Sequence, residues 1–179
     1  MASRSDFIYP NNGVPHSETK VASAPHPDVQ NSRVKIKDAV ITSMENLTHD
    51  TFLLTVKLDN NEHLESHAGQ YGTLKVDDLD KPRAFSFARG PNSEKKGEFS
   101  FFIKQIPGGL FSEYLKENRT GQKIVLSGPM GQFKIDESDE DMVCIAGGSG
   151  MSAINAIVEE AAHSQVKRNC YFFYGARQQ

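Results

Sequence analysis

The chain is organised around Arg83-Ala84-Phe85-Ser86-Phe87-Ala88, a run that alternates in side-chain character with the period of a β-strand. The guanidinium of Arg83 can bind a phosphate bidentately. The ring of Phe85 can lie on a flat heterocycle, and the hydroxyl of Ser86 can donate a hydrogen bond to a ring nitrogen. Together these groups suit a flavin dinucleotide. The alternative for so short a motif is an amphipathic strand with a chance arginine and serine.

Runs of strand length lie on both sides of this stretch and are separated by turn residues. They cover residues 34–41, 51–58, 69–76, 97–105 and 122–127, and a short helix is expected over about 110–118. With residues 83–88 this makes six strands and one helix, without the regular alternation of strand and helix that a parallel sheet requires. The sequence therefore predicts a six-stranded antiparallel barrel of Greek-key type.

The pattern changes after Asp141. An apolar run at 142–146 is typical of a parallel strand, and glycines, a helix with an apolar stripe and a second strand at 170–174 follow it. This is one βαβ unit. We expect a disordered leader over 1–32, which is rich in proline and lacks periodicity, a barrel over 33–135, and the start of a nucleotide-binding α/β domain over 136–179. The acidic run at 136–141 is expected to be a solvated linker.

Composition narrows the functional classes. The net charge of −3 offers no basic patch, so nucleic acid is not an expected partner. No run reaches the ~20 apolar residues of a membrane span, and no membrane association is expected. Cys144 and Cys170 lie in apolar runs and suit buried thiols in a reducing compartment, so we expect a cytoplasmic protein. His16 and His26 are too far apart to suggest a metal site.

The run Pro107-Gly108-Gly109-Leu110-Phe111-Ser112 places two glycines before the short helix. Backbone N–H groups at the start of a helix lack partners within the helix and can point at a pyrophosphate. Ser112 could add a hydroxyl group to such a site. The alternative is a plain strand-to-helix turn that Ser112 caps.

A second glycine-rich run, Gly148-x-Gly150-x-x-Ala153, follows a predicted strand and opens a helix, which is the context of a dinucleotide fingerprint. The acidic residue that usually follows ~20 positions later is absent. Instead, the second strand ends near Arg177, which offers a cation to the nucleotide.

In this order, the motifs R-x-[YF]-S, P-G-G-x-x-S, G-P-x-G-x-F, G-G-x-G-M and G-x-R resemble those of the ferredoxin reductase superfamily. The chain is most similar there to the NADH-dependent reductase components of bacterial ring-hydroxylating dioxygenases and related monooxygenases. The resemblance implies an FAD-dependent NAD(P)H oxidoreductase. Its FAD would accept a hydride from NADH or NADPH and pass electrons to an iron-sulfur protein or oxygenase component.

The resemblance also implies roles for particular residues. Arg83 would bind the FAD pyrophosphate, Phe85 would stack on the ring, and Ser86, the expected catalytic residue, would approach the flavin N5. The other implied FAD-binding positions are Phe102, Ile103, Lys104, Gly108, Gly109, Leu110 and Ser112. The positions implied for the nicotinamide dinucleotide are Gly148, Ser149, Gly150, Met151 and Arg177. No metal ligand is implied.

The sequence differs from the family's usual pattern in several places. The family usually has tyrosine at Phe85 and proline at Ala153, and the chain has no C-x4-C-x2-C cluster motif. It ends after one βαβ unit where the family continues, which suggests a fragment. One alternative is therefore an FAD-binding or partner-docking module without pyridine-nucleotide turnover in this truncated form. The other is a flavin-free barrel that acts as an interaction domain.

Overall fold

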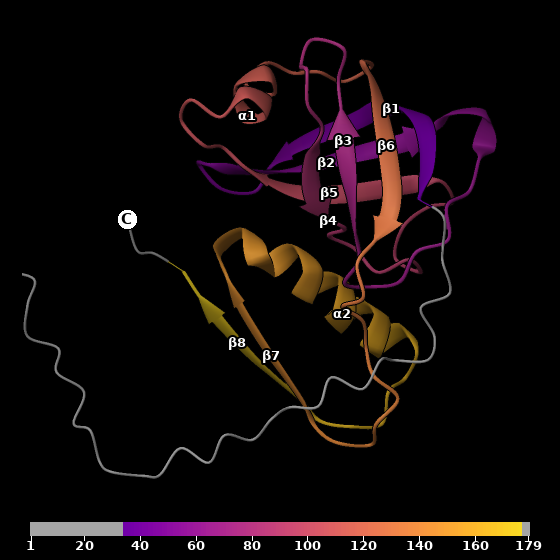
Figure 1. The fold of residues 1–179 in the computed structure, drawn as a ribbon. Coiled ribbons are helices and arrows are strands. Elements are labelled where there is room, and N and C mark those ends of the chain that lie inside the picture. Colours follow the sequence, from indigo (N-terminus) through magenta and orange to yellow (C-terminus); the bar gives the residue numbers. More distant parts are fainter. Residues whose placement is uncertain (1–33, 177–179) are drawn as a thin grey trace, which may run out of the picture. The chain divides into compact units, whose positions relative to one another are not determined.

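The computed structural model describes residues 34–176, which contain two separate sheets (Figure 1). The predicted leader, 1–32, lies outside the described residues. Six strands form the first sheet: β1 (Lys35–Asn46), β2 (Thr51–Leu58), β3 (Tyr71–Lys75), β4 (Arg83–Ser86), β5 (Glu98–Lys104) and β6 (Lys123–Met130). All pairings are antiparallel, in the order β4-β3-β6-β1-β2-β5. Because β6 lies between β3 and β1, the connections are those of a Greek key.

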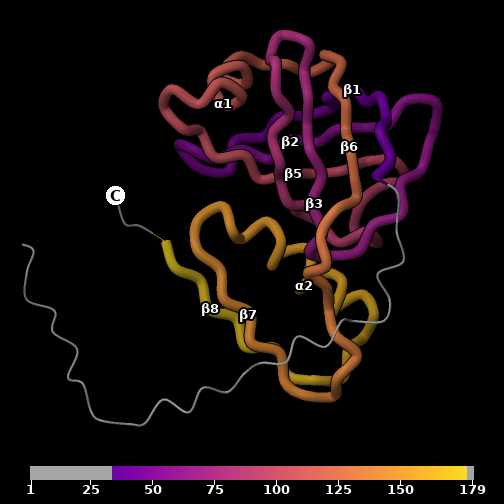
Figure 2. Tube along the Cα trace, viewed as in Figure 1, coloured from indigo at the N-terminus to yellow at the C-terminus, as the bar shows by residue number. Residues whose placement is uncertain are grey.

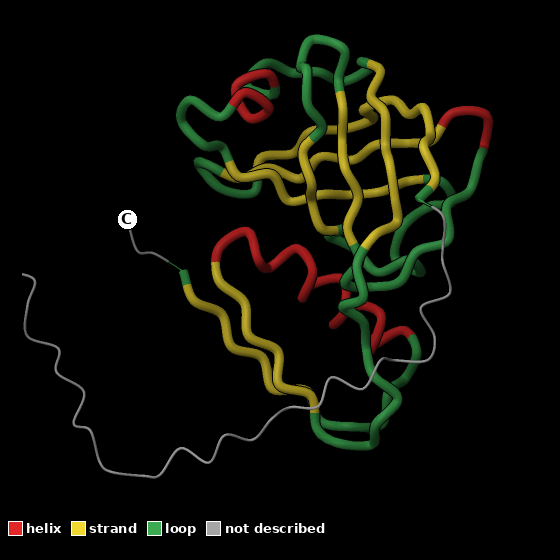
Figure 3. Tube along the Cα trace, in the orientation of Figure 1, coloured by secondary structure: helices red, strands yellow, loops and turns green. Residues whose placement is uncertain are grey.

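The two end strands of this sheet approach each other just beyond β4, so that the barrel nearly closes (Figure 3). The N–H of Ala88 donates to the carbonyl of Ser100 in β5 at 2.7 Å. The Phe87 ring packs beside Phe99 and Phe101, with centroid separations of 5.2 and 5.7 Å. The predicted six-stranded antiparallel barrel is confirmed.

The core of the barrel is built from the alternating apolar residues that the sequence displays. In β2 the side chains of Phe52, Leu54, Val56 and Leu58 are all buried, and the residues between them are more exposed. This is the period of two that a strand with one face toward the core requires.

The second sheet is the predicted βαβ unit. It consists of β7 (Met142–Gly147), a turn of 3₁₀ helix (Gly148–Gly150), α2 (Met151–His163) and β8 (Cys170–Gly175), and the two strands are parallel (Figure 2). One face of β7 packs on α2, where Cys144 and Ala146 form a small core with Ile154 and Ile157. The opposite face is exposed and carries Val143, Ile145, Tyr171 and Phe173.

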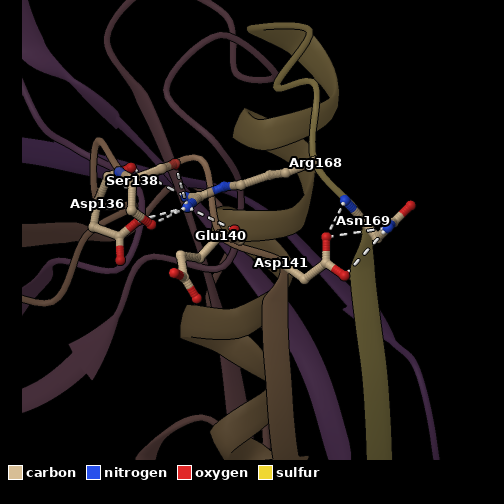
Figure 4. A network of polar contacts seen from close by, with 6 residues as sticks. All are labelled: Asp136, Ser138, Glu140, Asp141, Arg168 and Asn169. Carbon is tan, nitrogen blue, oxygen red and sulfur yellow. Dashed lines mark hydrogen bonds and ion pairs between the residues drawn. The ribbon is translucent and has the colours of Figure 1, made fainter.

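The acidic run is exposed along its whole length, and its backbone folds around Arg168 (Figure 4). The Nη1 of Arg168 donates to Asp136 Oδ1 at 2.6 Å and to the carbonyl of Ser138 at 2.7 Å, and Nη2 donates to the carbonyl of Asp136 at 3.1 Å. The Arg168 side chain is only 5% exposed. The predicted solvated linker is confirmed, since residues 136–141 are all exposed and lie outside any helix or strand, and the contacts of Arg168 order its backbone.

The short helix α1 (Leu110–Tyr114) ends four residues before the predicted end. Arg119 supplies the reason. Its Nε donates to the carbonyl of Tyr114 at 2.8 Å, and its guanidinium lies over the Tyr114 ring at 4.3 Å. The arginine thus takes a carbonyl that a longer helix would use internally. No helix within residues 34–176 is long and apolar enough to cross a membrane.

Candidate functional site

The strand β4 lies at one end of the sheet order and pairs only with β3 in that order. In the register, Phe85 lies opposite Gly72 and Ser86 opposite Tyr71. A Cβ at Gly72 would lie 2.8 Å from Leu126 Cδ1 and 3.1 Å from the carbonyl oxygen of Ser127, so glycine here lets β3 pack closely on β6. This pairing fixes the backbone of the predicted flavin-binding strand.

The ring of Phe85 joins β4 to α1. It is half-buried, and its centroid lies 5.2 Å from that of Phe111 and 6.5 Å from that of Phe101. Such offset and edge contacts are the favourable arrangements for aromatic pairs. The ring is therefore held between the Arg83 strand and the glycine turn, the two elements predicted to bind one ligand.

Arg83 keeps most of its hydrogen-bonding capacity for a ligand. Its Nη1 donates weakly to the carbonyls of Lys81 and Pro82, at 3.4 and 3.2 Å. A guanidinium carries five N–H donors in a planar fork. The remaining donors suit a phosphate group beside β4.

The glycine turn before α1 is organised by Ser112. Its hydroxyl accepts from the N–H of Ile106 at 3.1 Å and shares its own hydrogen between the carbonyls of Ile106 and Gly109, each at 2.9 Å. A Cβ at Gly109 would lie 2.8 Å from that hydroxyl, whereas nothing lies within 4 Å of a Cβ at Gly108, where φ is +75°. The observed role of Ser112 is to shape the turn, and its phosphate contact stays a prediction.

The predicted residues of β5 divide between the two faces of the strand. Ile103 is 1% exposed and its side chain belongs to the barrel core, so that only its backbone could touch a ligand. Phe102 is half-buried and Lys104 is exposed. Lys104 forms an ion pair with Asp50 at 2.9 Å, and this contact, together with hydrogen bonds from Thr51 and Thr48, lowers the pKa of Asp50 to about 2. Leu110, at the start of α1, is exposed.

The second glycine-rich run connects β7 to α2 and is open to solvent. Gly148, Ser149 and Gly150 are exposed, and Met151 is half-buried. Gly148 has a φ of +52°, and a Cβ at Gly148 or Gly150 would have nothing within 4 Å. The loop thus has the backbone freedom and the space that a bound phosphate needs. Arg177, the last of the predicted nucleotide ligands, lies outside the described residues.

The glycine loop and the flavin-binding strand are brought together by the first turn of α2. The hydroxyl of Ser152 donates to the carbonyl of Ser86 at 2.9 Å. Three residues further along α2, Asn155 Nδ2 donates to the carbonyl of Ala88 at 2.7 Å. Sequence reasoning missed both residues, although Ser152, Asn155 and Glu159 form a polar stripe along one side of this helix, which was a usable signal. Within residues 34–176 no cluster of His, Cys, Asp and Glu could hold a metal ion.

This barrel, with an arginine-bearing edge strand and a glycine loop beside it, has the architecture of a flavin-dependent oxidoreductase domain. Residues 38–135 match the family described as the oxidoreductase FAD-binding domain. The chain belongs to this family, and FAD is the cofactor of its barrel.

Relatives and solved structures agree with this assignment. The chain is 34% identical to the xylene/toluene monooxygenase electron transfer component XylA of Pseudomonas putida, over 79% of this chain and 39% of the relative. It is 32% identical to the naphthalene 1,2-dioxygenase system ferredoxin–NAD(P)+ reductase component of Pseudomonas putida, over 81% of this chain and 43% of the relative. The ferredoxin reductase in carbazole 1,9a-dioxygenase superimposes with a TM-score of 0.71 at 30% identity, over 80% of this chain and 43% of that one. The chain thus spans about two fifths of the length of these proteins.

Proposed function

We propose that this chain is the flavin-carrying part of an NAD(P)H-dependent electron-transfer reductase. FAD, when bound, supplies a centre that takes up a hydride from NADH or NADPH and releases electrons singly to an iron-sulfur protein or oxygenase component. The relatives support this partner class, since their names describe electron-transfer and reductase components of oxygenase systems.

The residues present fit FAD. Arg83 binds the pyrophosphate through its free N–H donors, and the open turn at Gly108 receives the same group from the other side. Phe85 provides the apolar surface for the ring, and Ser86 is assigned to its reacting edge. With phenylalanine at position 85, the strand offers a ring face without a phenolic hydroxyl. The glycine loop Gly148–Gly150, with Ser149 and Met151, binds the pyridine nucleotide, and Arg177 binds its phosphate or ribose.

The single observation that carries the proposal is the hydrogen bond from Ser152 to the carbonyl of Ser86. Ser152 lies in the first turn of the helix that the glycine loop opens, and Ser86 ends the strand of Arg83 and Phe85. A nucleotide at the loop therefore lies close to a flavin on β4. Hydride transfer requires this proximity, because the reacting atoms must come within about 3–3.5 Å of each other.

A second candidate function is an FAD-binding or partner-docking module without pyridine-nucleotide turnover. The exposed apolar face of β7 and β8 favours it, because a two-stranded sheet covered on one side makes an incomplete nucleotide-binding unit. Anaerobic stopped-flow mixing of the FAD-loaded protein with NADH, and separately with NADPH, distinguishes the two. Saturable bleaching of the flavin absorbance supports the reductase. Stably bound FAD without bleaching supports the FAD-binding module. A protein that does not bind FAD refutes both candidate functions.

We assign residues 33–135 to the FAD-binding domain and 136–179 to the start of the nucleotide-binding domain. We also propose a cytoplasmic location, since the thiols of Cys144 and Cys170 are both free and suit a reducing compartment.

A further inference from the structure

The helix α2 carries a polar stripe that faces away from its own sheet. Ser152, Asn155 and Glu159 are three and four residues apart and so share one side of the helix. Their contacts are with the chain that continues β4, residues 86–90, and not with β7. We define this set of contacts as the α2 clamp.

Glu159 is the centre of the α2 clamp. Its Oε2 accepts a hydrogen bond from the N–H of Gly90 at 2.9 Å, and its Oε1 accepts one from Asn155 Nδ2 at 3.2 Å. The Nε of Arg89 lies 2.8 Å from the same Oε1, as an ion pair whose N–H direction does not make a well-aligned hydrogen bond. Partial burial raises the pKa of Glu159, but the Gly90 N–H and the Arg89 charge outweigh this and lower it. Glu159 is therefore ionised at neutral pH.

Gly90 allows the helix to come this close. A Cβ at Gly90 would lie 3.2 Å from both the carbonyl oxygen of Ala156 and the backbone nitrogen of Glu160. A side chain at this position would require α2 to shift by a few tenths of an ångström from the segment that follows β4. Ser152 is itself only 4% exposed, so water cannot readily replace its bond to Ser86.

The same backbone is held independently by the barrel. The N–H of Phe87 donates to the carbonyl of Gln70 at 3.0 Å, and that of Ala88 donates to the carbonyl of Ser100 at 2.7 Å. The barrel thus binds this segment through the N–H groups of Phe87 and Ala88, and α2 binds it through the carbonyls of Ser86 and Ala88 and the N–H of Gly90. Loss of the α2 bonds should leave β4 in place and free only the helix.

We propose that Ser152, Asn155 and Glu159 are positioning residues that fix the glycine loop Gly148–Gly150 relative to Ser86. They thereby set how the nicotinamide meets the flavin. This inference rests on the proposed function. A misplacement of ~1 Å can cost about a hundredfold in rate. The clamp therefore governs hydride transfer and contributes little to FAD affinity.

The test compares FAD-loaded wild-type protein with a Ser152→Ala/Asn155→Ala double variant. Ser152→Thr, which keeps the hydroxyl, serves as the rescue variant. The matched control is Asn118→Ala. The Oδ1 of Asn118 accepts a hydrogen bond from the N–H of Thr120 at 2.9 Å in an exposed turn of the barrel. Four quantities are measured: FAD affinity, the change in the flavin spectrum on adding NAD+, and the limiting rate and the KM of anaerobic reduction by NADH.

We expect the double variant to bind FAD within about threefold of wild type. The spectral response to NAD+ should shrink, and the limiting rate should fall about ten- to hundredfold with a smaller change in KM. Ser152→Thr and Asn118→Ala should behave as wild type. Gly90→Ala, which retains every polar group of the clamp but displaces the helix, should reproduce the loss of rate.

Each contrary outcome is distinguishable. A wild-type protein that responds to neither NAD+ nor NADH refutes the proposed function and the inference with it. A responsive wild type with an equally responsive double variant overturns the inference alone. A double variant that loses FAD in parallel with its rate shows a structural role and also overturns it. Should that variant fail to fold, the same measurements on Ser152→Ala, which removes one bond, decide the matter.

Discussion

Arg83 is the residue on which FAD affinity should depend most. Replacing it with alanine removes charge-assisted bonds to the pyrophosphate, and such bonds contribute about 1.5–3 kcal/mol. We expect FAD affinity to fall roughly ten- to hundredfold, as measured by titration of the apoprotein. The control is Lys123→Ala, which removes an equal charge at the exposed start of β6. Unchanged affinity in Arg83→Ala would mean that the strand is purely structural.

Glu94 should cost the protein stability at neutral pH. Its Oε1 is buried without a hydrogen-bond partner among residues 34–176, and burial raises its pKa despite the nearby Ser100 and Arg89. A raised pKa in the folded state means that stability is lost as pH rises through that pKa. Glu94→Gln should therefore increase the free energy of unfolding at pH 7.

The increase in the free energy of unfolding that Glu94→Gln brings should shrink as the pH approaches the ordinary glutamate pKa of 4.5, because wild-type Glu94 becomes protonated there. Urea unfolding of wild type and variant at both pH values checks this. If the free energies of unfolding of wild type and variant differ by the same amount at the two pH values, the charge of Glu94 is not the cause of the difference.

Sequence motifs proposed candidate site residues that are close together in the chain, such as Arg83, Phe85 and Ser86. They could not predict contacts between distant segments, and the bond from Ser152 to Ser86 spans 66 residues. They also could not separate side-chain from backbone roles. Ile103 is the example, since its side chain lies in the core.

At the scale of elements, the contacts of Arg168 should hold the acidic run in place. Arg168→Met removes the donors to the carbonyls of Asp136 and Ser138 and should lower the free energy of unfolding by about 1.5–3 kcal/mol. Most of this loss should come from the carbonyl bonds, because the Asp136 side chain is 72% exposed and its ion pair is screened.

Hydrogen exchange over residues 134–142 provides the local readout. Lys167→Met, at the neighbouring exposed position, is the control and should leave this exchange unchanged. If Arg168→Met also leaves it unchanged, the run is ordered by something other than the guanidinium.

The types of the elements followed from hydrophobic periodicity, but their ends did not. β1 continues to Asn46, five residues beyond the predicted end, because it pairs with β2 along that length and accommodates an irregularity between Ile41 and Ser43. α1 is shortened by Arg119, which a helix pattern does not reveal. Tertiary contacts therefore set the boundaries in both cases.

At the scale of the whole chain, the uncovered face of β7 and β8 should cause self-association. Val143, Ile145, Tyr171 and Phe173 form a contiguous apolar face, and exposed faces and strand edges of this kind promote association. We expect the sedimentation coefficient of this chain to rise with concentration. Ile145→Lys/Phe173→Lys should abolish that rise, whereas Gln122→Lys, at an exposed barrel position, should not. A concentration-independent wild type would contradict the prediction.

We infer that β4 and the glycine turn converge on the pyrophosphate of FAD. Titration of the apoprotein with FAD and with FMN, which lacks a pyrophosphate, tests it most directly. We expect FAD to bind at least about tenfold more tightly than FMN, which corresponds to one charge-assisted contact of about 1.4 kcal/mol or more. Equal affinity for FAD and FMN would contradict it.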